Sequence, residues 1–408
     1  MDFSDFYKTK TLYSICLIEK IPIIVNYLIL KTMIENKNKI CNRCVMDTSD
    51  CEIQFDEKGN CNHCNNYFNR IAGMAYQGEK SDREFDALIK TMKEKGKNSK
   101  YDCVIGVSGG VDSTYVAYLA KERGLRVLLV HLDNGWNTPV GEENVRNIVN
   151  LLGFDFEVFK LDWDEFRQMQ IAFLRASVPD IEAPTDMAIP AALHYFAKKY
   201  NVKYIVSGGN FATEGILPNS WFYNAKDTRY MKSILKRFCP IKIRKFPFFG
   251  WKEEAWCKMV RGIKMVYFLN FVPYSKDEAI KVLEDKLNWK YYGGKHYESL
   301  YTGFEQAYIL PKKFNIDYRK ATFSTQICAG TMTRESALAE LSHPAYNPDT
   351  ISQEIKTICD KLGITVEDFE AIMHDPPKYY WDYPNDEKKL AFIYSVYRKL
   401  TGKKDYRK

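Results

Sequence analysis

The stretch "CVIGVSGGVDSTYVAYLA" at residues 103–120 decides the fold. Its first part is a short apolar run typical of a buried β-strand, and its last part has the pattern of a helix that ends at Gly124. Between them stands Ser108-Gly109-Gly110, followed closely by Asp112 and Ser113. Glycines between a strand and a helix let backbone N–H groups turn toward an anion, and the helix N-terminus attracts negative charge. The stretch therefore predicts a phosphate-binding loop.

Strands and helices alternate along the chain from this point. The predicted strands are residues 102–107, 126–132, 154–161 and 203–209. The predicted helices are residues 112–124, 141–152 and 186–200, preceded by a helix within 78–100. This alternation predicts an α/β fold with an open parallel sheet and helices on both faces. The strand ends at Ser108, Asp133 and Ser207 would then meet at one edge, where such sheets bind ligands.

Composition narrows the class of protein. With 408 residues, 46% hydrophobic and 27% charged, the chain predicts a globular protein of more than one compact unit. A net charge of +7 suits anionic partners such as nucleotides but does not indicate nucleic-acid binding. The apolar run at 21–30 is too short to span a membrane, and no cleavable secretory pattern is visible. We therefore expect a cytoplasmic protein without a membrane span.

Two cysteine pairs precede the sheet. Cys41 and Cys44 form one C-x-x-C pair, and Cys61 and Cys64 form the other. Sixteen residues lie between the two pairs. This spacing is typical of a four-thiolate zinc site, which is closed and structural rather than catalytic. A redox pair or an iron–sulfur cluster remains the alternative. The sequence therefore predicts an N-terminal zinc ribbon.

The loop at 108–113 differs from two common nucleotide-binding motifs. No lysine follows the glycines, as the Walker loop requires, and the G-x-G-x-x-G pattern of dinucleotide-binding folds is absent. The pattern S-G-G-x-D-S instead resembles the pyrophosphate loop (PP-loop) of the HUP-like ATP pyrophosphatases related to asparagine synthetase and GMP synthetase. The resemblance implies that ATP adenylates a carbonyl oxygen, and that a nitrogen or sulfur nucleophile then displaces AMP. A tight turn with a helix cap is the structural alternative.

The resemblance assigns a set of ATP-binding residues. Asp112 is the predicted Mg²⁺ ligand, because carboxylate oxygens suit this ion. Asp133 and Asn134 follow the second strand, where superfamily members seat the adenosine, although an ordinary polar loop there remains open. The same alternative remains for the residues after the fourth strand. The full predicted set is Ser108, Gly109, Gly110, Val111, Asp112, Ser113, Asp133, Asn134, Gly208, Gly209, Asn210 and Glu214.

Longer motifs resemble the N-acetyl sugar amidotransferase family within this superfamily. They are "CNRCVMDT" at 41–48, the run from Gly293 to Ala321, and "GTMTRESAL" at 330–338. Tyr318 departs from the family pattern, which has a lysine after the aspartate. The resemblance implies that an acetamido group of a nucleotide-linked sugar becomes acetamidino in lipopolysaccharide or O-antigen biosynthesis. The ammonia is expected from a separate glutaminase partner, because no glutaminase domain is apparent.

Candidate catalytic residues follow from the same region. Lys295, Lys313 and Arg334 are expected to bind phosphates or stabilise charge on the activated amide, together with Asp112 and Ser113 of the loop. His296 or Glu298 is expected to take a proton from the attacking ammonia. For each of these side chains, a solvated or ion-paired role is the alternative.

The main alternative function is that of a PP-loop tRNA thiolation enzyme. The cysteines outside the two N-terminal pairs form no C-x-x-C pair, which does not favour it. The basic and aromatic stretch at 229–251 is compatible with a nucleotide sugar, a tRNA backbone or a protein partner.

Changes of pattern along the chain predict four regions. We expect an N-terminal extension at 1–38, with Met33 a candidate natural start, and the zinc ribbon at 39–75. A PP-loop amidotransferase domain at 76–345 and a helical C-terminal region at 346–408 complete the chain.

Overall fold

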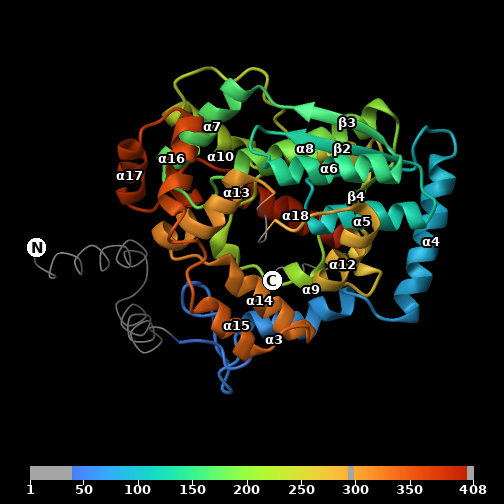
Figure 1. Cartoon of the computed structure of the whole chain (residues 1–408), viewed down its shortest axis with the longest axis horizontal. Helices are drawn as coiled ribbons and strands as arrows, with labels where there is room; N and C mark the ends of the chain where they lie inside the picture. Colours follow the sequence, from blue (N-terminus) through green and yellow to red (C-terminus); the bar gives the residue numbers. More distant parts are fainter. Residues whose placement is uncertain (1–38, 293–297, 402–408) are drawn as a thin grey trace, which may run out of the picture.

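The sheet expected from the alternating pattern lies at the centre of the computed structural model, which describes residues 39–292 and 298–401 (Figure 1). All strand pairs are parallel, in the order β3-β2-β1-β4-β5. The chain adds β2 and β3 on one side of β1, then returns to add β4 and β5 on the other. The order therefore reverses between β1 and β4, where open sheets bind ligands. The strands are β1 (Cys103–Gly106), β2 (Val127–Asp133), β3 (Asp155–Lys160), β4 (Tyr204–Ser207) and β5 (Lys264–Tyr267).

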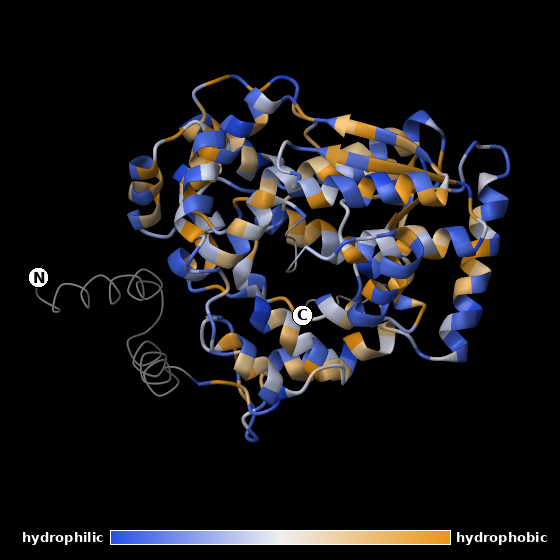
Figure 2. Cartoon of the chain, viewed as in Figure 1, coloured by the Kyte–Doolittle hydropathy of each residue, from blue (hydrophilic) through white to orange (hydrophobic). Residues whose placement is uncertain are grey.

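Helices cover both faces of the sheet because successive strand residues point in opposite directions. Val104 belongs to the hydrophobic cluster that contains the buried residues of α7 and α8. Its neighbour Ile105 packs in a second cluster with α5, α6 and α12. In Figure 2 the central strands carry long hydrophobic stretches. The bounds of these helices are α5 (Val111–Glu122), α6 (Pro139–Leu152), α7 (Trp163–Ala176), α8 (Ala183–Lys199) and α12 (Lys276–Leu287).

The predicted fold class is confirmed. The four predicted strands lie within two residues of β1 to β4, and the predicted helices correspond to α4 (Glu79–Gly96), α5, α6 and α8. The sequence reasoning missed α7 and the short edge strand β5. The expected extension at 1–38, with Met33, lies outside the described residues.

The cysteine pairs lie in a small module before α4. It is held by isolated bridges that pair Ile40 with Asp47 and Phe55 with Cys61. The module contains no extended strand pairs among its described residues, and short backbone hydrogen bonds such as Cys41 N–H to the Met46 carbonyl oxygen join its turns. Its helical elements are α3 (Asn62–Asn66), η1 (Tyr67–Ile71) and η2 (Ala72–Met74).

The chain after β4 is mostly helical, as predicted for its last part. Within the described ranges, no helix has the length and apolar character needed to cross a membrane. Before β5 these elements are α9 (Phe211–Glu214), η3 (Asn219–Trp221), α10 (Thr228–Phe238) and α11 (Trp251–Met259). After it they are η4 (Phe268–Asn270), α13 (Leu300–Phe304), η5 (Glu305–Phe314), α14 (Tyr318–Ala329), α15 (Arg334–Leu341), α16 (Ile351–Leu362), α17 (Val366–His374), η6 (Tyr380–Asp382) and α18 (Glu387–Thr401).

Candidate active site and cysteine cluster

The glycine loop turns the chain from β1 into α5. Gly109 has a φ of +86°, a conformation that favours glycine. A Cβ at this position would lie 2.5 Å from the carbonyl oxygen of Gly141. The indole Nε1 of Trp289 donates a hydrogen bond to the Gly109 carbonyl oxygen at 2.8 Å. The turn therefore has a fixed shape that residues from distant parts of the chain support.

Hydrogen bonds within the loop fix its donors. The Gly110 N–H donates to Ser108 Oγ at 3.2 Å, and the Ser108 N–H donates to Ser113 Oγ at 3.3 Å. Thr114 Oγ1 donates to the Gly110 carbonyl oxygen at 2.7 Å. A loop that is ordered before its ligand arrives loses little entropy on binding.

A small cavity of about 170 Å³ lies against this loop. It is smaller than the roughly 300–1,000 Å³ typical of whole-ligand pockets, so its size suits a diphosphate group. Lys276 is the only lysine or arginine among its described lining residues, and it begins α12. The lining comprises Ser108, Gly110, Val111, Asp112, Ser113, Gly208, Gly209, Glu214, Lys276, Tyr292 and Glu298.

Asp112 lies in this cavity and accepts a hydrogen bond from the hydroxyl of Tyr274. Burial and the nearby Asp112 carboxylate raise the pKa of Tyr274 far above its ordinary value. The phenol therefore stays protonated and donates to the carboxylate. A carboxylate beside a phosphate cradle has the chemistry of a Mg²⁺ ligand.

The second predicted loop, after β4, closes the other side of the cavity. A Cβ on Gly208 would lie 2.9 Å from the Asp112 backbone carbon and 3.0 Å from the Ser113 nitrogen, so the two loops touch. Gly209 and Glu214 also line the cavity. Asn210 instead caps α9, because its Oδ1 accepts from the Thr213 N–H at 2.8 Å.

A larger cleft of about 610 Å³ adjoins the small cavity. Ser108, Ser113, Gly208 and Glu298 line both spaces. The described lining of the cleft contains five carboxyl side chains, one histidine and no lysine or arginine. The described lining of the cleft is therefore rich in carboxyls without a lysine or arginine, whereas the small cavity has Lys276 beside Asp112, Glu214 and Glu298.

The two predicted adenosine-binding residues have different positions. Asn134 lines the larger cleft. Asp133 does not appear in its lining, because its Oδ1 accepts from the Gly135 N–H at 3.0 Å and its Oδ2 lies 3.8 Å from Lys160 Nζ. His131, which sequence reasoning did not select, lines the cleft and is 2.8 Å from the Val107 carbonyl oxygen through Nδ1.

Two of the predicted catalytic cations lie away from both spaces. Lys313 donates to the Ile372 carbonyl oxygen, and burial lowers its pKa to about 8. Arg334 donates to the backbone carbonyl oxygens of Cys41 and Cys44, each at 3.0 Å. Lys313 and Arg334 thus form hydrogen bonds to backbone carbonyl oxygens, and the phosphate contacts expected for them stay predictions. Lys295 and His296 lie outside the described residues.

Buried carboxyls form the inner end of the cleft. Asp180 accepts from the Tyr230 hydroxyl at 3.1 Å, and Glu182 accepts from the Thr302 hydroxyl at 2.8 Å. Burial raises the pKa of each carboxyl to about 7. Sequence reasoning missed this group. The available signal was "PDIEAPTD" at 179–186, which places three carboxyls in an otherwise apolar stretch.

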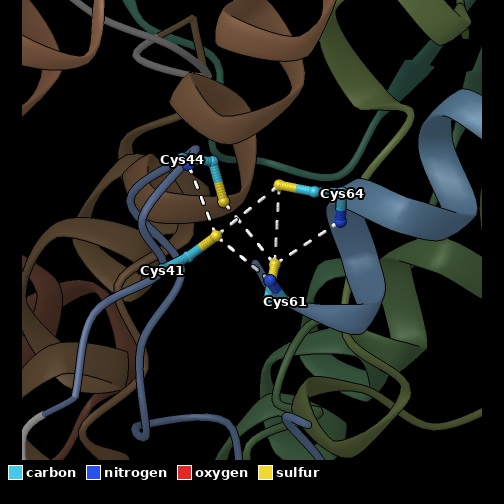
Figure 3. Close-up of side chains that lie close together, drawn as sticks. All are labelled: Cys41, Cys44, Cys61 and Cys64. Carbon is cyan, nitrogen blue, oxygen red and sulfur yellow. Dashed lines mark hydrogen bonds between the residues drawn. The ribbon is translucent and has the colours of Figure 1, made fainter. Parts of the chain in front are cut away.

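The four cysteines of the N-terminal pairs converge as predicted (Figure 3). Their Sγ atoms all lie within 4.8 Å of one another, and all four residues are buried. The Sγ–Sγ distances are 3.8 Å for Cys41–Cys64, 3.7 Å for Cys44–Cys61 and 3.6 Å for Cys61–Cys64. Backbone N–H groups also point at the sulfurs, as with the Cys61 N–H at 3.2 Å from Cys41 Sγ. The cluster is able to hold a metal ion.

Helix α14 connects this cluster to the cleft. Cys328 Sγ lies 3.7 Å from Cys64 Sγ, and Ser324 Oγ accepts from the Val45 N–H at 3.3 Å. At the other end of α14, Tyr318 lines the cleft. Tyr318 is the residue that departs from the family pattern, and its ring stacks on Trp221 at a centroid distance of 5.8 Å.

Two segments of the chain that contribute to the site match known protein families. Residues 102–213, from β1 through the loop after β4, match the family model for queuosine biosynthesis protein QueC. Through this segment the chain is similar to the PP-loop ATP pyrophosphatases. Residues 298–400 match the model described as the C-terminal domain of LPS biosynthesis protein WbpG-like proteins. The chain therefore combines a segment similar to PP-loop enzymes with a WbpG-like C-terminal segment, which confirms the resemblance expected from the loop.

Individual relatives align with different fractions of this chain. The uncharacterized protein MJ1599 of Methanocaldococcus jannaschii is 25% identical over 68% of this chain and 84% of its own length. A probable mitochondrial tRNA-specific 2-thiouridylase of Caenorhabditis elegans is 28% identical over 31% of this chain and 36% of its own. The solved U34-tRNA thiolase NcsA of Methanococcus maripaludis covers 75% of this chain and 89% of its own, at 12% identity and a TM-score of 0.28. The chain thus spans about a third of that thiouridylase.

Proposed function

We propose that this protein is an ATP-dependent amidotransferase that converts an acetamido group of a nucleotide-linked sugar into an acetamidino group. One observation carries the proposal. The segment that matches the WbpG-like domain supplies six of the residues that line the cleft beside the PP-loop. Acceptor specificity therefore comes from a part related to lipopolysaccharide biosynthesis. The six residues are Glu298, Ser299, Thr302, Glu305, Gln306 and Tyr318.

In the proposed reaction, the small cavity holds the β and γ phosphates of ATP through the loop donors and Lys276. The amide oxygen of the acceptor attacks the α phosphorus, and pyrophosphate leaves. Ammonia then attacks the imidate carbon, and the former amide oxygen leaves with AMP. Asp112 is the residue that would hold Mg²⁺, which neutralises phosphate charge when bound.

Glu298 is the proposed proton acceptor. It lies where the two cavities meet, and its Oε1 accepts from Ser108 Oγ at 3.4 Å. A carboxylate at this place is within the same cavity as both the activated carbon and the incoming ammonia. The predicted roles of Lys295 and His296 stay predictions.

We propose zinc as the metal of the cysteine cluster. A tetrahedral site with a Zn–S distance of about 2.3 Å has S–S edges of about 3.8 Å, close to the separations of the four sulfurs. The set of four thiols without an open position fits a structural ion. Metal analysis of the purified chain by mass spectrometry would find about one zinc per chain, and iron in its place would overturn the assignment.

The proposed ammonia source is a glutaminase partner. Large apolar side chains are exposed beside the edge strand β5: Trp256 at 47%, Met259 at 77% and Val260 at 67%. They lie within residues 229–271, the surface we propose for contact with that partner. The isolated chain would then use ammonium salts, and glutamine only after the partner is added. Efficient use of glutamine by the isolated chain would contradict this. The pathway we propose is cytoplasmic synthesis of lipopolysaccharide or O-antigen.

The tRNA thiolation alternative draws support from the 2-thiouridylase relatives. The cleft does not favour it, because none of its described lining residues is a cysteine that would carry sulfur. A product that contains sulfur in place of nitrogen would decide for this alternative.

A heavy-oxygen label tests the proposed function directly. Candidate nucleotide-linked sugars, labelled in the acetamido oxygen, are incubated with the full chain, ATP, Mg²⁺ and an ammonium salt. We expect the label in AMP, and a sugar product in which an NH group has replaced oxygen. Label that stays on the sugar while ATP is consumed would contradict adenylation of the amide.

A further inference from the structure

Four carboxyl side chains among the lining residues of the cleft form what we call the carboxyl chamber: Asp180, Glu182, Asp186 and Glu305. Asp186 lies on α8 and Glu305 begins η5 of the WbpG-like segment, so separate elements bring these groups together. Asp180 and Glu182 are buried completely enough for burial to raise their pKa values to about 7. Burial, together with repulsion from Glu182, Asp186 and Asp180, raises the pKa of Glu305 well above its ordinary value.

Two polar groups at this chamber have no hydrogen-bond partner among the described residues. Glu305 is 5% exposed and lines the cleft, and its carboxyl has no hydrogen bond in the described ranges, where only its backbone N–H is bonded. The hydroxyl of Tyr301 is fully buried near Glu182 and Glu305 and also lacks a partner there, although Tyr301 is not among the residues that line the cleft. Buried polar groups without partners are rare in folded proteins and point to a missing ligand. The ligand must therefore bind hydrogen-bonding groups of the carboxyl chamber.

The charge of the chamber selects the sign of that ligand. No lysine or arginine is among the described lining residues of the cleft, so an anionic group there would meet uncompensated carboxyls. The cation of the site, Lys276, lines the small cavity instead. Phosphates are therefore favoured beside the PP-loop, and a positively charged group is favoured in the chamber.

The arrangement of the carboxyls argues against a metal ion. In the described part of the chain, the only group of three or more such ligand atoms within 4.8 Å of one another is the cysteine cluster. The carboxyl oxygens are therefore too spread to close around a compact ion. A planar cation with several N–H donors pairs with separate carboxylates, as guanidinium groups do.

From these contacts we infer that the carboxyl chamber binds an amidinium cation, the acetamidino group that the acceptor's acetamido group becomes. This inference rests on the proposed function. The charge balance of the reaction agrees with it, since the acetamido group is neutral and the acetamidino group is protonated in water. When ammonia replaces the adenylated oxygen, one proton passes to a base and AMP carries the oxygen away. The positive charge remains on the new C–N unit, where the chamber stabilises it.

The inference also orients the acceptor. Its acetamido end enters the chamber, and the diphosphate of its nucleotide carrier stays outside the carboxyl-lined part of the cleft. A carboxyl surface that binds a cation more tightly than its neutral precursor favours charge developing in the transition state over the ground state.

Binding of small probes to the full chain tests the chamber without turnover. Acetamidinium chloride, acetamide and ammonium chloride are compared by ligand-observed NMR and calorimetry. We expect acetamidinium to bind and to bind at least about tenfold more tightly than either comparison compound. Equal binding of acetamide or of ammonium would overturn the inference.

The variant Glu305→Gln should weaken acetamidinium binding about tenfold or more, because glutamine cannot ionise to pair with the bound cation. The fold should persist, because glutamine resembles the protonated carboxyl that burial favours at this position. The matched control is Glu370→Gln, on the exposed face of α17, which should leave binding unchanged. Unchanged binding in a folded Glu305→Gln protein would overturn the inference.

The outcomes separate this inference from the proposed function. Formation of an acetamidino sugar by a wild type that fails to bind acetamidinium would refute the chamber alone. Acetamidinium binding that depends on Glu305, without any acetamidino product, would refute the proposed function and leave a cation site.

Discussion

Gly208 is the residue at which the two loops of the nucleotide site touch. A Cβ there would lie 2.9 Å from the Asp112 backbone carbon and 3.0 Å from the Ser113 backbone nitrogen. Backbone atoms cannot rotate away as a side chain can. Gly208→Ala should therefore displace the PP-loop and lower pyrophosphate release about tenfold or more. The control is Gly73→Ala, because a Cβ at Gly73 meets nothing within 4 Å. Full activity in Gly208→Ala would show that the loop tolerates the shift.

The buried carboxyls predict a pH dependence of stability. Burial raises the pKa of Asp180 from 3.8, and that of Glu182 from 4.5, to about 7. Between about pH 4 and 7 the folded chain then binds more protons than the unfolded chain, so the free energy of unfolding falls as pH rises. The slope should be on the order of 1 kcal/mol per pH unit per group and vanish above pH 7.

Glu182→Gln isolates this effect. The variant keeps the acceptor for the Thr302 hydroxyl but loses the titration. The melting temperature, measured from pH 5 to 8, should therefore fall less steeply with rising pH for the variant than for the wild type. Identical slopes would show that Glu182 titrates normally.

Local pattern predicted the PP-loop but not its partners. Ser108, Gly110, Asp112 and Ser113 fall within six residues, so their convergence could be predicted from the strand and helix around them. Lys276 comes from more than 160 residues away and begins a helix with no nucleotide motif of its own. Glu182 and Glu305 are also far apart in the sequence, so local pattern could not predict that both line the cleft. For Arg334, a cation inside a family motif, the sequence did not indicate that its guanidinium donates to two backbone carbonyl oxygens.

At the scale of elements, the strands that could be predicted from the sequence are those with a clear apolar pattern. Strands β1 and β2 are buried apolar runs, and they were found. The edge strand β5 reads "KMVY", with most of its residues exposed, because an edge strand buries little of its surface. Nothing in four such residues distinguishes a strand from a loop, so only its pairing with β4 defines it.

The cysteine module is the element with the least independent structure. Cys44→Ser should remove one corner of the cluster, lower the metal content, and destabilise the module by several kcal/mol, because metal binding and folding are linked. Thermal unfolding and metal analysis of the purified variant measure both effects. The control is Cys51→Ser, since Cys51 is exposed and outside the cluster. Equal metal content in Cys44→Ser and wild type would exclude a four-thiolate site.

At the scale of the whole molecule, the WbpG-like segment joins the cysteine module to the cleft. Its residues line the cleft at Glu298 and Glu305, and its helix α14 contacts the module through Ser324 and Cys328. Lys320 on the same helix forms an ion pair with Asp47 at 2.5 Å. The cysteine cluster, which lies outside the cleft, therefore supports the wall that shapes the proposed acceptor site.

Arg334 tests this long-range organisation. Its guanidinium donates hydrogen bonds to the backbone carbonyl oxygens of Cys41 and Cys44. Arg334→Ala therefore leaves these two oxygens without this donor. The expected cost is about 1–3 kcal/mol of unfolding free energy, together with faster loss of metal to a chelator. A phosphate-binding role predicts the opposite pattern, a raised KM for ATP with metal retention unchanged. Glu335→Ala, the exposed neighbour, serves as control. Because α14 reaches the cleft, we expect Arg334→Ala to weaken acceptor binding after metal loss, while pyrophosphate binding at the PP-loop persists.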